Sequence, residues 1–286
     1  MKILITGAAG QLGRALVLEA GRRGWEAAPT DLGELDITDA GSVWEHLSRF
    51  LPEAVINAAA ATRVDDLEAD PDLALKVNAL GPRNLAAACR RLGVKLVHVS
   101  TDYVFDGTKA GAYVEWDEPR PLSVYGLSKL LGEKLVREQC PDHFIVRTAW
   151  LYGLPGPNFV TAILGRGRIQ APGQEFKVVH DQRGTPTSTL ALAPQLLALA
   201  QTRAFGTYHA TCQGEATWYE FARHILNKAG LDVVVTPCTT AEYPRPARRP
   251  ANSVLENRML GLSGLDLMPP WQEAFSQYWE QCGELL

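Results

Sequence analysis

The sequence lacks the features of an extracellular, membrane-bound or nucleic-acid-binding protein. Its five cysteines are odd in number and widely spaced, without a Cys-x-x-Cys pair or a Cys/His grouping. No apolar run approaches the length of a membrane span, and "KILITG" follows Met1 directly, too soon for a signal-peptide core. A formal net charge of -4 gives no reason to expect nucleic acid as a partner. We therefore expect a cytoplasmic protein without a structural zinc site, a membrane span or a nucleic-acid partner.

Low-complexity tracts and internal repeats are also absent, and nothing in the composition indicates disorder. With 46% hydrophobic and 21% charged residues, the chain has the composition of an ordinary folded protein. Its 286 residues can bury a substantial core in one large or two modest domains.

Short apolar runs alternate with helical patterns through the first half of the chain. Predicted strands cover residues 2–6, 26–31, 54–60, 95–101 and 143–153. Helical spacing follows between them, most clearly at residues 10–25, 40–50 and 72–93. This alternation predicts an α/β fold of the Rossmann type, a doubly wound parallel sheet with helices on both faces.

Beyond about residue 150 the pattern changes. Loops such as "GLPGPN" and "RIQAPGQ" interrupt a weaker periodicity, which predicts a second, smaller α/β domain over residues 151–286 after a first domain over residues 1–150. The segment 187–201 is strongly helical and is expected to pack back on the first domain.

A glycine turn follows the first predicted strand. Gly7, Gly10 and Gly13 in "GAAGQLG" would let backbone N–H groups and a helix N-terminus approach a pyrophosphate. Asp31, eighteen residues after Gly13, is the residue type that hydrogen-bonds adenosine ribose hydroxyls, although a plain turn residue is an alternative. Because an acid repels a 2'-phosphate, this position favours NADH. The next loop, "LDIT", offers a carboxylate and an aliphatic cover to an adenine, Asp36 and Ile37.

The stretch "YGLSK" places Tyr125 and Lys129 four residues apart, on one face of a predicted helix. A nearby ammonium would lower the pKa of the phenol toward a value useful for proton transfer. Such a pair is common on surface helices. However, Thr101 ends the fourth predicted strand, at the sheet edge where the glycine turn also lies. Together these residues predict a catalytic site in which Thr101 binds a substrate oxygen, Tyr125 exchanges its proton and Lys129 holds the nicotinamide ribose.

This order of motifs resembles the extended short-chain dehydrogenase/reductase superfamily. "NAAA" at 57–60 and the helix that contains Asn78 fit the same group. The motifs "STDYVFDG", "RTAWLYG", "DQRGTPT" and "ARRPANSVL" narrow the resemblance to the dTDP-4-dehydrorhamnose reductase family over essentially the whole chain.

The resemblance implies hydride transfer from NADPH or NADH to the C4 carbonyl of dTDP-4-dehydro-6-deoxy-L-mannose, giving dTDP-L-rhamnose. By matching position, Thr101 and Asp102 would contact the sugar, and Trp150 would line its pocket. The family commonly has His where this chain has Ala61, which puts a polar contact there in doubt. The resemblance places the following residues in the cofactor cleft: Gln11, Leu12, Asp31, Asp36, Ile37, Ala60, Ala61 and Thr62.

Arg248 and Arg249 lie in a basic stretch between two prolines. Guanidinium forks pair with phosphate oxygens, so these residues would suit a nucleotide diphosphate, with a solvated basic turn as the alternative. Asn158 and Asn252 are weaker candidates for the nucleotide or a lid. Residues expected in the core instead of a site are His98, Trp218, Tyr219 and Phe221.

Two other functions fit parts of the pattern. A nucleotide-sugar dehydratase or epimerase would keep its NAD bound, but dehydratases need Asp then Glu after the Thr, and here Tyr103 follows Asp102. The regulatory beta subunit of methionine adenosyltransferase resembles the same family and acts by binding a partner. The intact Thr101, Tyr125 and Lys129 favour an enzyme. The choice of NADPH or NADH, other 4-keto sugars, a divalent metal and the oligomeric state, including a homodimer, stay open.

Overall fold

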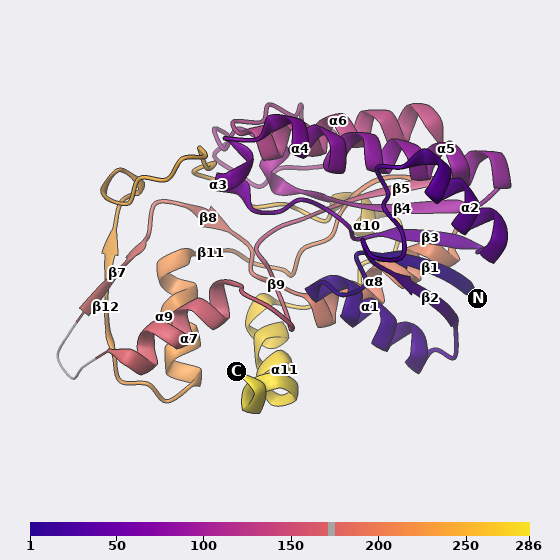
Figure 1. The fold of residues 1–286 in the computed structure, drawn as a ribbon. Coiled ribbons are helices and arrows are strands. Elements are labelled where there is room, and N and C mark those ends of the chain that lie inside the picture. The colour runs from indigo at the N-terminus through magenta and orange to yellow at the C-terminus, as the bar shows by residue number, and fades with distance from the viewer. Residues whose placement is uncertain (171–174) are drawn as a thin grey trace.

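The computed structural model describes residues 1–170 and 175–286 (Figure 1). The residues "APGQ" of one expected loop, 171–174, lie outside the described residues. Six parallel strands form the main sheet in the order β2-β1-β3-β4-β5-β10, and the predicted doubly wound sheet is confirmed. These strands are β1 (Lys2–Thr6), β2 (Glu26–Thr30), β3 (Ala54–Asn57), β4 (Lys95–Thr101), β5 (His143–Thr148) and β10 (Gly206–His209).

Two details of the sheet differ from the prediction. The strand expected over residues 143–153 divides into β5 and the short β6 (Leu151–Tyr152), because Trp150 between them adopts a left-handed backbone with φ of 47°. The sixth strand, β10, comes from beyond residue 200 and pairs in parallel with β5.

Helices cover both faces of the sheet (Figure 1). One face carries α2 (Ala40–Phe50), α5 (Gly81–Leu92) and α6 (Val124–Gln139), and the other carries α1 (Gln11–Arg22) and α8 (Thr189–Gln201). Successive strand residues point to opposite faces, so Ile3 and Ile5 join the core beside α1 and α8 while Leu4 joins the core beside α2 and α5.

The helix predicted over residues 72–93 is interrupted. It begins as α4 (Pro71–Leu75), widens into a π-helical turn (Lys76–Leu80) and continues as α5. Asn78 lies in this turn and is fully buried. A π-turn redirects side chains within a helix and is frequent at functional sites, which is the role that Asn78 takes below.

A smaller lobe lies to one side of the sheet (Figure 1). It contains the parallel pair β7 (Glu175–Val179) and β12 (Val234–Cys238), with α7 (Phe159–Ile169), α9 (Trp218–Lys228) and α11 (Trp271–Cys282) packed nearby. The remaining short elements are α3 (Val64–Leu67), a 3-10 turn (Asp102–Val104), β8 (Arg183–Gly184), β9 (Thr187–Ser188), β11 (Ala216–Thr217), a 3-10 turn (Thr240–Glu242), α10 (Arg258–Leu262) and a 3-10 turn (Gly283–Leu285).

The lobe and the sheet share one hydrophobic core. Leu16 of α1 and Leu196 of α8 belong to the same cluster as Phe221 of α9 and Phe275 of α11. The C-terminal end of α8 is held by Lys95 Nζ, which donates to the carbonyls of Ala200 and Thr202 at 2.9 and 2.8 Å. Chain beyond residue 150 therefore supplies a strand and a helix to the main sheet, and the domain boundary near residue 150 stays a prediction. Of the residues expected in the lobe's core, Phe221 is fully buried, while Trp218 and Tyr219 are partly buried.

Candidate active site

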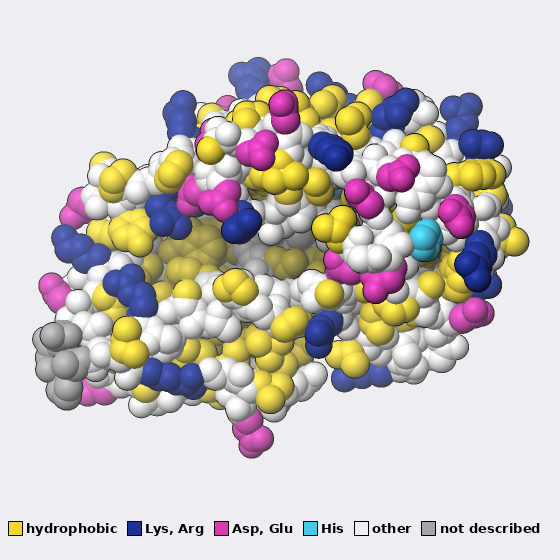
Figure 2. Space-filling view, viewed as in Figure 1, with side chains coloured by type: hydrophobic (Ala, Val, Ile, Leu, Met, Phe, Trp, Pro, Cys, Tyr) yellow, Lys and Arg dark blue, Asp and Glu magenta, His cyan; other side chains and the backbone are white. Residues whose placement is uncertain are grey.

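A cleft of about 920 Å³ opens at the carboxyl ends of the parallel strands, and Figure 2 shows it as a hollow between the sheet region and the smaller lobe. The substrate candidates Arg248, Arg249 and Asn252 do not line it. The other candidates do: Gly7, Gly10, Gln11, Leu12, Gly13, Asp31, Asp36, Ile37, Ala60, Ala61, Thr62, Thr101, Asp102, Tyr125, Lys129, Trp150 and Asn158.

The glycine turn connects β1 to α1 in a space that side chains could not enter. Gly7 has a φ of 67°, and a Cβ added to Gly13 would lie 2.1 Å from the Gly7 carbonyl oxygen. Gly10 caps α1 without a side chain, so the positive end of the helix dipole faces the cleft. This cradle fits the pyrophosphate of a dinucleotide.

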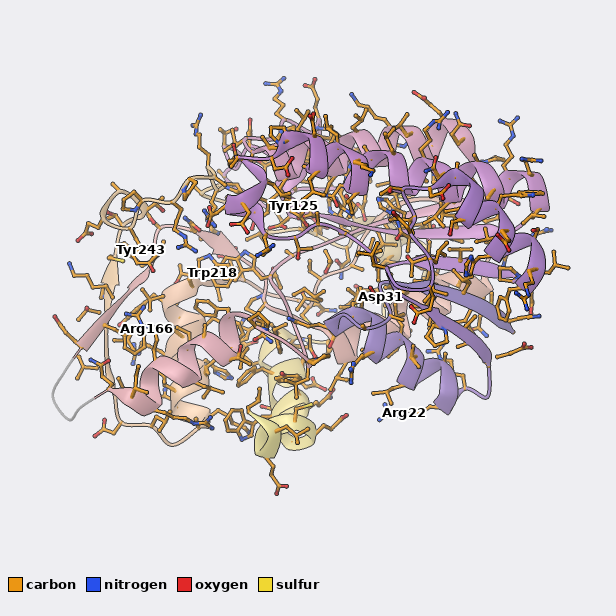
Figure 3. The ribbon with its side chains drawn as sticks, viewed as in Figure 1. Arg22, Asp31, Tyr125, Arg166, Trp218 and Tyr243 are labelled. Atoms are coloured by element: carbon orange, nitrogen blue, oxygen red, sulfur yellow. The ribbon has the colours of Figure 1, made fainter. Side chains whose placement is uncertain are left out.

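Asp31 ties the end of β2 to this turn, beside the start of α1 (Figure 3). Its Oδ2 accepts from the Ala9 N–H at 2.9 Å and its Oδ1 from the Leu32 N–H at 2.8 Å. A carboxylate has about four acceptor positions, so lone pairs remain for ribose hydroxyls. Among the described residues that line the cleft, the acids at this end are Asp31 and Asp36, and the one Lys or Arg is Lys129.

The loop with Asp36 and Ile37 is held rigidly. Asp36 Oδ1 accepts from both the hydroxyl and the N–H of Thr38 at 2.8 Å, and these bonds lower the pKa of the carboxyl. Asn84 Nδ2 donates to the carbonyls of Ile37 and Thr38, both at 3.1 Å. The loop thus presents an acid and an aliphatic side chain to the cleft.

Tyr125 and Lys129 lie one turn apart at the beginning of α6, whose N-terminus is capped by Ser123 (Figure 3). Lys129 is 2% exposed, and its Nζ donates to the Val99 carbonyl of β4 at 2.7 Å. Burial lowers the pKa of Lys129 to about 8, with the Glu133 carboxylate acting in the opposite direction. The ammonium therefore faces the strand ends and stays largely protonated near neutral pH.

The predicted lowering of the Tyr125 pKa is wrong for this structure. Burial raises the pKa of Tyr125 to about 12; the Thr101 hydroxyl lowers it and the Asp102 charge raises it. The interaction that acts to lower the pKa comes from Thr101, while Lys129 is bonded to a backbone carbonyl. A phenol with this pKa keeps its proton at neutral pH, as a proton donor requires.

Asp102 is a buried acid at the reacting end of the cleft. It is 2% exposed, and its Oδ1 accepts from the Thr101 hydroxyl at 2.9 Å. Its Oδ2 has no hydrogen-bond partner in the described part of the chain. Burial raises the pKa of Asp102 to about 6. A buried acceptor without a partner is costly, and this oxygen could accept a hydrogen bond from a ligand hydroxyl.

Trp150 stands across the cleft on the lobe side. Its ring stacks on Trp218 with centroids 3.4 Å apart, and its Nε1 donates to Ser253 Oγ at 3.2 Å. A Cβ on Gly184 would lie 2.3 Å from the indole, so only glycine fits there. Trp218 packs against the core of the lobe, as expected, and also supports Trp150 at the cleft wall.

The two arginines of the basic stretch have different environments. Arg249 forms a bidentate ion pair with Asp65 of α3, in which Nη1 donates to Oδ1 at 3.1 Å and Nη2 donates to Oδ2 at 3.0 Å. Arg245 Nε is 3.3 Å from the same carboxylate. Arg248 is exposed and makes no hydrogen bond or ion pair within residues 1–170 and 175–286. Arg248 is therefore free to meet a phosphate, whereas Arg249 ties the lobe segment to the sheet region.

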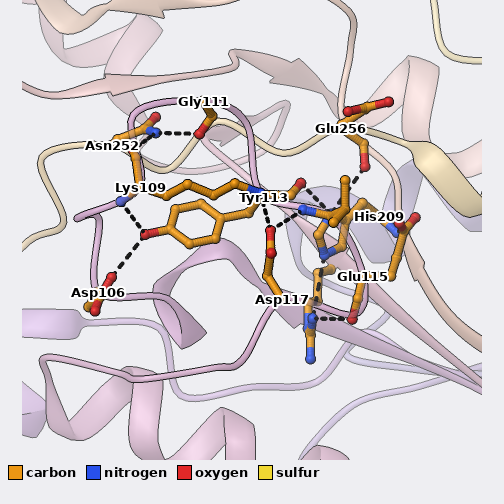
Figure 4. A network of polar contacts seen from close by, with 11 residues as sticks. Asp106, Lys109, Gly111, Tyr113, Glu115, Asp117, His209, Asn252 and Glu256 are labelled. Carbon is orange, nitrogen blue, oxygen red and sulfur yellow. Dashed lines mark hydrogen bonds and ion pairs between the residues drawn. The ribbon is translucent and has the colours of Figure 1, made fainter.

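Both candidate asparagines form hydrogen bonds with other parts of the protein chain. Asn158 caps α7, accepting from the Thr161 N–H at 3.1 Å and donating to the Gly153 carbonyl at 2.7 Å. Asn252 donates to the carbonyls of Lys109 and Gly111 at 2.8 and 2.9 Å (Figure 4). Both Asn252 amide hydrogens are therefore used within the chain, and its contact with substrate stays a prediction.

His98 is buried as expected, but only one of its two ring nitrogens has a hydrogen-bond partner among the described residues. Its Nδ1 is 3.0 Å from Asn57 Nδ2, and Asn57 Oδ1 accepts from the Thr6 hydroxyl at 2.7 Å, which gives a polar ladder across three strands. Its Nε2 has no partner among the described atoms. Burial, followed by the Lys129 charge, lowers the pKa of His98, so the ring is neutral.

Three further residues near the cleft were given no role in the site by the sequence analysis. Asn78 joins the cofactor cleft to α6: it bonds both the N–H and the carbonyl of Ala61, and donates to Ser128 Oγ at 3.1 Å. Tyr103 lies edge-on to Tyr125, with ring centroids 5.6 Å apart. Glu133 follows Lys129 by one more turn, and the i+4 spacing that links Tyr125 to Lys129 could have found it.

A parallel sheet with a glycine turn, a strand-end threonine and a Tyr-x-x-x-Lys helix at one cleft defines a short-chain dehydrogenase/reductase type of oxidoreductase. The sequence matches the RmlD substrate binding domain family over residues 1–283, and the chain belongs to this family.

Named relatives resemble the chain over nearly its full length. A dTDP-4-dehydrorhamnose reductase of Streptomyces griseus is 43% identical, with 96% of this chain and 91% of the relative covered. The crystal structure of a dTDP-4-dehydrorhamnose reductase from Clostridium acetobutylicum has a TM-score of 0.96 and 48% identity, covering 99% of this chain and all of the other. The Bacillus anthracis enzyme in complex with NADP has a TM-score of 0.95 and 40% identity, covering 98% of this chain and 100% of that chain.

Proposed function

We propose that this protein is a dTDP-4-dehydrorhamnose reductase that uses NADH or NADPH. The observation that carries the proposal is the convergence of the glycine cradle, Thr101, Tyr125 and Lys129 on one cleft. Full-length relatives with this activity in their names support the same substrate, dTDP-4-dehydro-6-deoxy-L-mannose. The reduced nicotinamide, when bound, supplies the hydride.

Tyr125 is the proton donor in this proposal. The hydroxyl holds its proton at neutral pH, because burial raises its pKa to about 12. Negative charge developing on the C4 oxygen of the sugar would draw that proton across a short hydrogen bond. The Thr101 hydroxyl lies against Tyr125 and would orient the same oxygen.

Lys129 holds the positive charge of the site. Its ammonium, bonded to the Val99 carbonyl, has donors left for ribose hydroxyls and would stabilise the phenolate after proton transfer. Asn78 fixes the backbone of Ala61 across the cleft, so the wall that faces the nicotinamide is rigid.

The substrate side is assigned as follows. Asp102 would accept a bond from a sugar hydroxyl through its unpartnered Oδ2, and Trp150 would cover the sugar. Arg248 would meet the diphosphate, because its guanidinium is exposed. Arg249 supports that segment through Asp65.

We further propose that this enzyme prefers NADH. A 2'-phosphate at the adenosine end would meet Asp31 and Asp36, and the one Lys or Arg among the described lining residues is Lys129. The NADP complex of the Bacillus anthracis relative makes NADPH the alternative cofactor.

Reduction is favoured over the other functions considered. Elimination needs a second acid beside Asp102, and the next residue, Tyr103, has a pKa raised by burial and cannot take that role. A purely regulatory protein has no need of a phenol, a buried ammonium and a strand-end hydroxyl placed in one cleft.

The cellular setting belongs to the same proposal. All five cysteines are free and four of them are buried, which supports a reducing cytoplasm. Across the described residues, the structure has no helix with both the length and the apolar character of a membrane span. We propose residues 1–150 as the cofactor domain and 151–286 as the substrate domain, with α8 and β10 returned to the former.

Substrate-dependent loss of reduced nicotinamide absorbance tests the function. The purified protein should oxidise NADH, and NADPH less efficiently, only when the dTDP-linked 4-keto sugar is added. No oxidation of either by the folded protein with authentic substrate would refute the proposal.

A further inference from the structure

A buried ion pair lies behind the catalytic helix. Glu133 of α6 is 0% exposed and Arg147 of β5 is 2% exposed. Arg147 Nε donates to Glu133 Oε1 at 2.9 Å, and Nη2 donates to Oε2 at 2.7 Å. Burying two charges costs desolvation energy that their attraction often fails to recover, so stability alone explains such a pair poorly. Its fork geometry, however, fixes orientation closely.

Glu133 belongs to the same stripe as the catalytic residues. Tyr125, Lys129 and Glu133 follow one another at i+4 spacing, so all three face β4. Lys129 Nζ bonds the Val99 carbonyl at 2.7 Å, and Ser100 Oγ donates to Glu133 Oε1 at 2.6 Å. Successive turns of α6 are thus pinned to successive residues of β4.

Arg147 is itself held so that it cannot turn away. Its Nη1 is 3.4 Å from both the Glu115 carbonyl and His209 Nε2. His209 Nδ1 lies 3.2 Å from the Tyr113 and Glu256 carbonyls (Figure 4), so Nδ1 carries the proton and Nε2 accepts from Arg147. Burial lowers the pKa of His209 to about 3, which keeps this ring neutral.

We propose that Glu133 is a positioning residue for the Tyr125–Lys129 pair. Clamped by Arg147, it holds α6 in register on β4, and its negative charge helps to keep the neighbouring Lys129 protonated. The proposal rests on the reductase function given above, and it adds a part of the site that lies outside the cleft lining.

The charges around Lys129 determine whether its pKa rises or falls when Glu133 is replaced. Without the Glu133 carboxylate, the ammonium would be buried near the unpaired Arg147 cation, so its pKa would fall. Asn78, which packs on α6 from the π-turn, does not ionise. Further ionisable groups lie near this stripe. They are Tyr125 on α6, Tyr103 beside it, His98 on β4, Asp102 beyond β4, Arg137 at the outer end of α6, and Glu68 just after α3, which accepts from the Val124 N–H.

Two variants and one control distinguish a positioning role of Glu133 from a contribution to folding alone. Glu133→Gln removes the charge with little change of shape. The double variant Glu133→Leu with Arg147→Met replaces the pair by apolar groups, a change that is often neutral for stability. Glu138→Gln removes the same charge from an exposed position on the same helix. Each protein is measured for melting temperature, for kcat against pH, and for NADH binding against pH by nicotinamide fluorescence.

We expect both pair variants to lose about 10- to 100-fold in kcat at neutral pH, because small misplacements of reacting groups cost that much. The alkaline limb of kcat and of NADH binding should move to lower pH, since Lys129 would lose its proton sooner. The Glu138→Gln control should match wild type throughout.

The role would be overturned if the folded variants keep wild-type kcat and pH profiles, whatever happens to their melting temperatures. If Glu133→Gln does not fold, the double variant decides. A wild-type protein that oxidises no cofactor would instead refute the reductase function, and the pH dependence of NADH binding would still report on the role of Glu133.

Discussion

Replacing Arg248 and Arg249 one at a time should produce two different defects. Arg249→Ala removes two charge-assisted bonds to Asp65 and leaves that carboxylate with Arg245 and the Ala247 N–H. Bonds to charged groups contribute about 1.5–3 kcal/mol, and the Arg249 and Asp65 side chains are only 18% and 22% exposed. A loss of about 2 kcal/mol should lower the melting temperature by about 4 °C in a chain of this size. Arg248→Ala removes an exposed side chain and should leave the melting temperature unchanged.

Kinetics complete this comparison. Loss of one phosphate contact in Arg248→Ala should raise the KM for the dTDP-sugar by about 10-fold while the KM for NADH stays unchanged. Asp65→Asn should reproduce the stability loss of Arg249→Ala, and the double variant should lose less than the sum, because both changes break the same contact. Thermal melts and steady-state kinetics on the four proteins test this. Equal melting temperatures and equal KM changes for the two arginine variants would refute the reasoning.

The same ion pair has a defined pH dependence. Burial alone would raise the pKa of Asp65, but the Arg249 fork, the Ala247 N–H and Arg245 hold it below its ordinary value. Because the folded pKa is lower than the unfolded one, the stabilisation is complete above the unfolded pKa of ~3.9 and is lost as the pH falls through the folded value. The difference in melting temperature between wild type and Asp65→Asn should therefore disappear in acid.

Three further predictions concern the cleft. Gly13→Ala should abolish cofactor binding, measured by fluorescence titration, because its Cβ would lie 2.1 Å from the Gly7 carbonyl; wild-type affinity would contradict the cradle. The kcat/KM for NADH should exceed that for NADPH, and Asp31→Ser should narrow the ratio by about 10-fold, whereas an unchanged ratio would remove Asp31 from cofactor choice. Asp102→Asn should lower turnover yet raise the melting temperature at pH 8. Burial raises the pKa of Asp102 to about 6, above the unfolded ~3.9, so its ionisation destabilises the fold as the pH rises between these values; a lower melting temperature at pH 8 would show that the carboxylate is stabilising.

Much of the sheet could be predicted because its signals are local. β1 and β4 are apolar, β-branched runs, so the sequence alone predicts them as strands. The glycine turn after β1 is a common binding site for a pyrophosphate. β10 could not be found in this way. It has only four residues, begins with Gly206 and is a strand because β5 presents an open edge to it. Its place is a consequence of tertiary pairing.

The residues of the site likewise fall into those predictable from local sequence and those that depend on tertiary structure. Tyr125, Lys129 and Asp31 are predictable because spacing within one element, or at the end of one strand, is enough to place them. The partner of Arg249 lies 184 residues away in the sequence, and no local pattern joins the two. Likewise, the high pKa of Tyr125 depends on burial by the folded chain, which sequence spacing does not report.

The proton donor is the central claim, and Tyr125→Phe tests it most directly. Rapid mixing of this variant, preloaded with NADH, with the dTDP-linked 4-keto sugar measures a single turnover. Within the described residues, the hydrogen-bonding contact of the Tyr125 hydroxyl is with Thr101, so NADH affinity should stay near wild type while the rate of oxidation falls by about 10²- to 10⁴-fold. A rate within twofold of wild type, at unchanged affinity, would contradict the assignment.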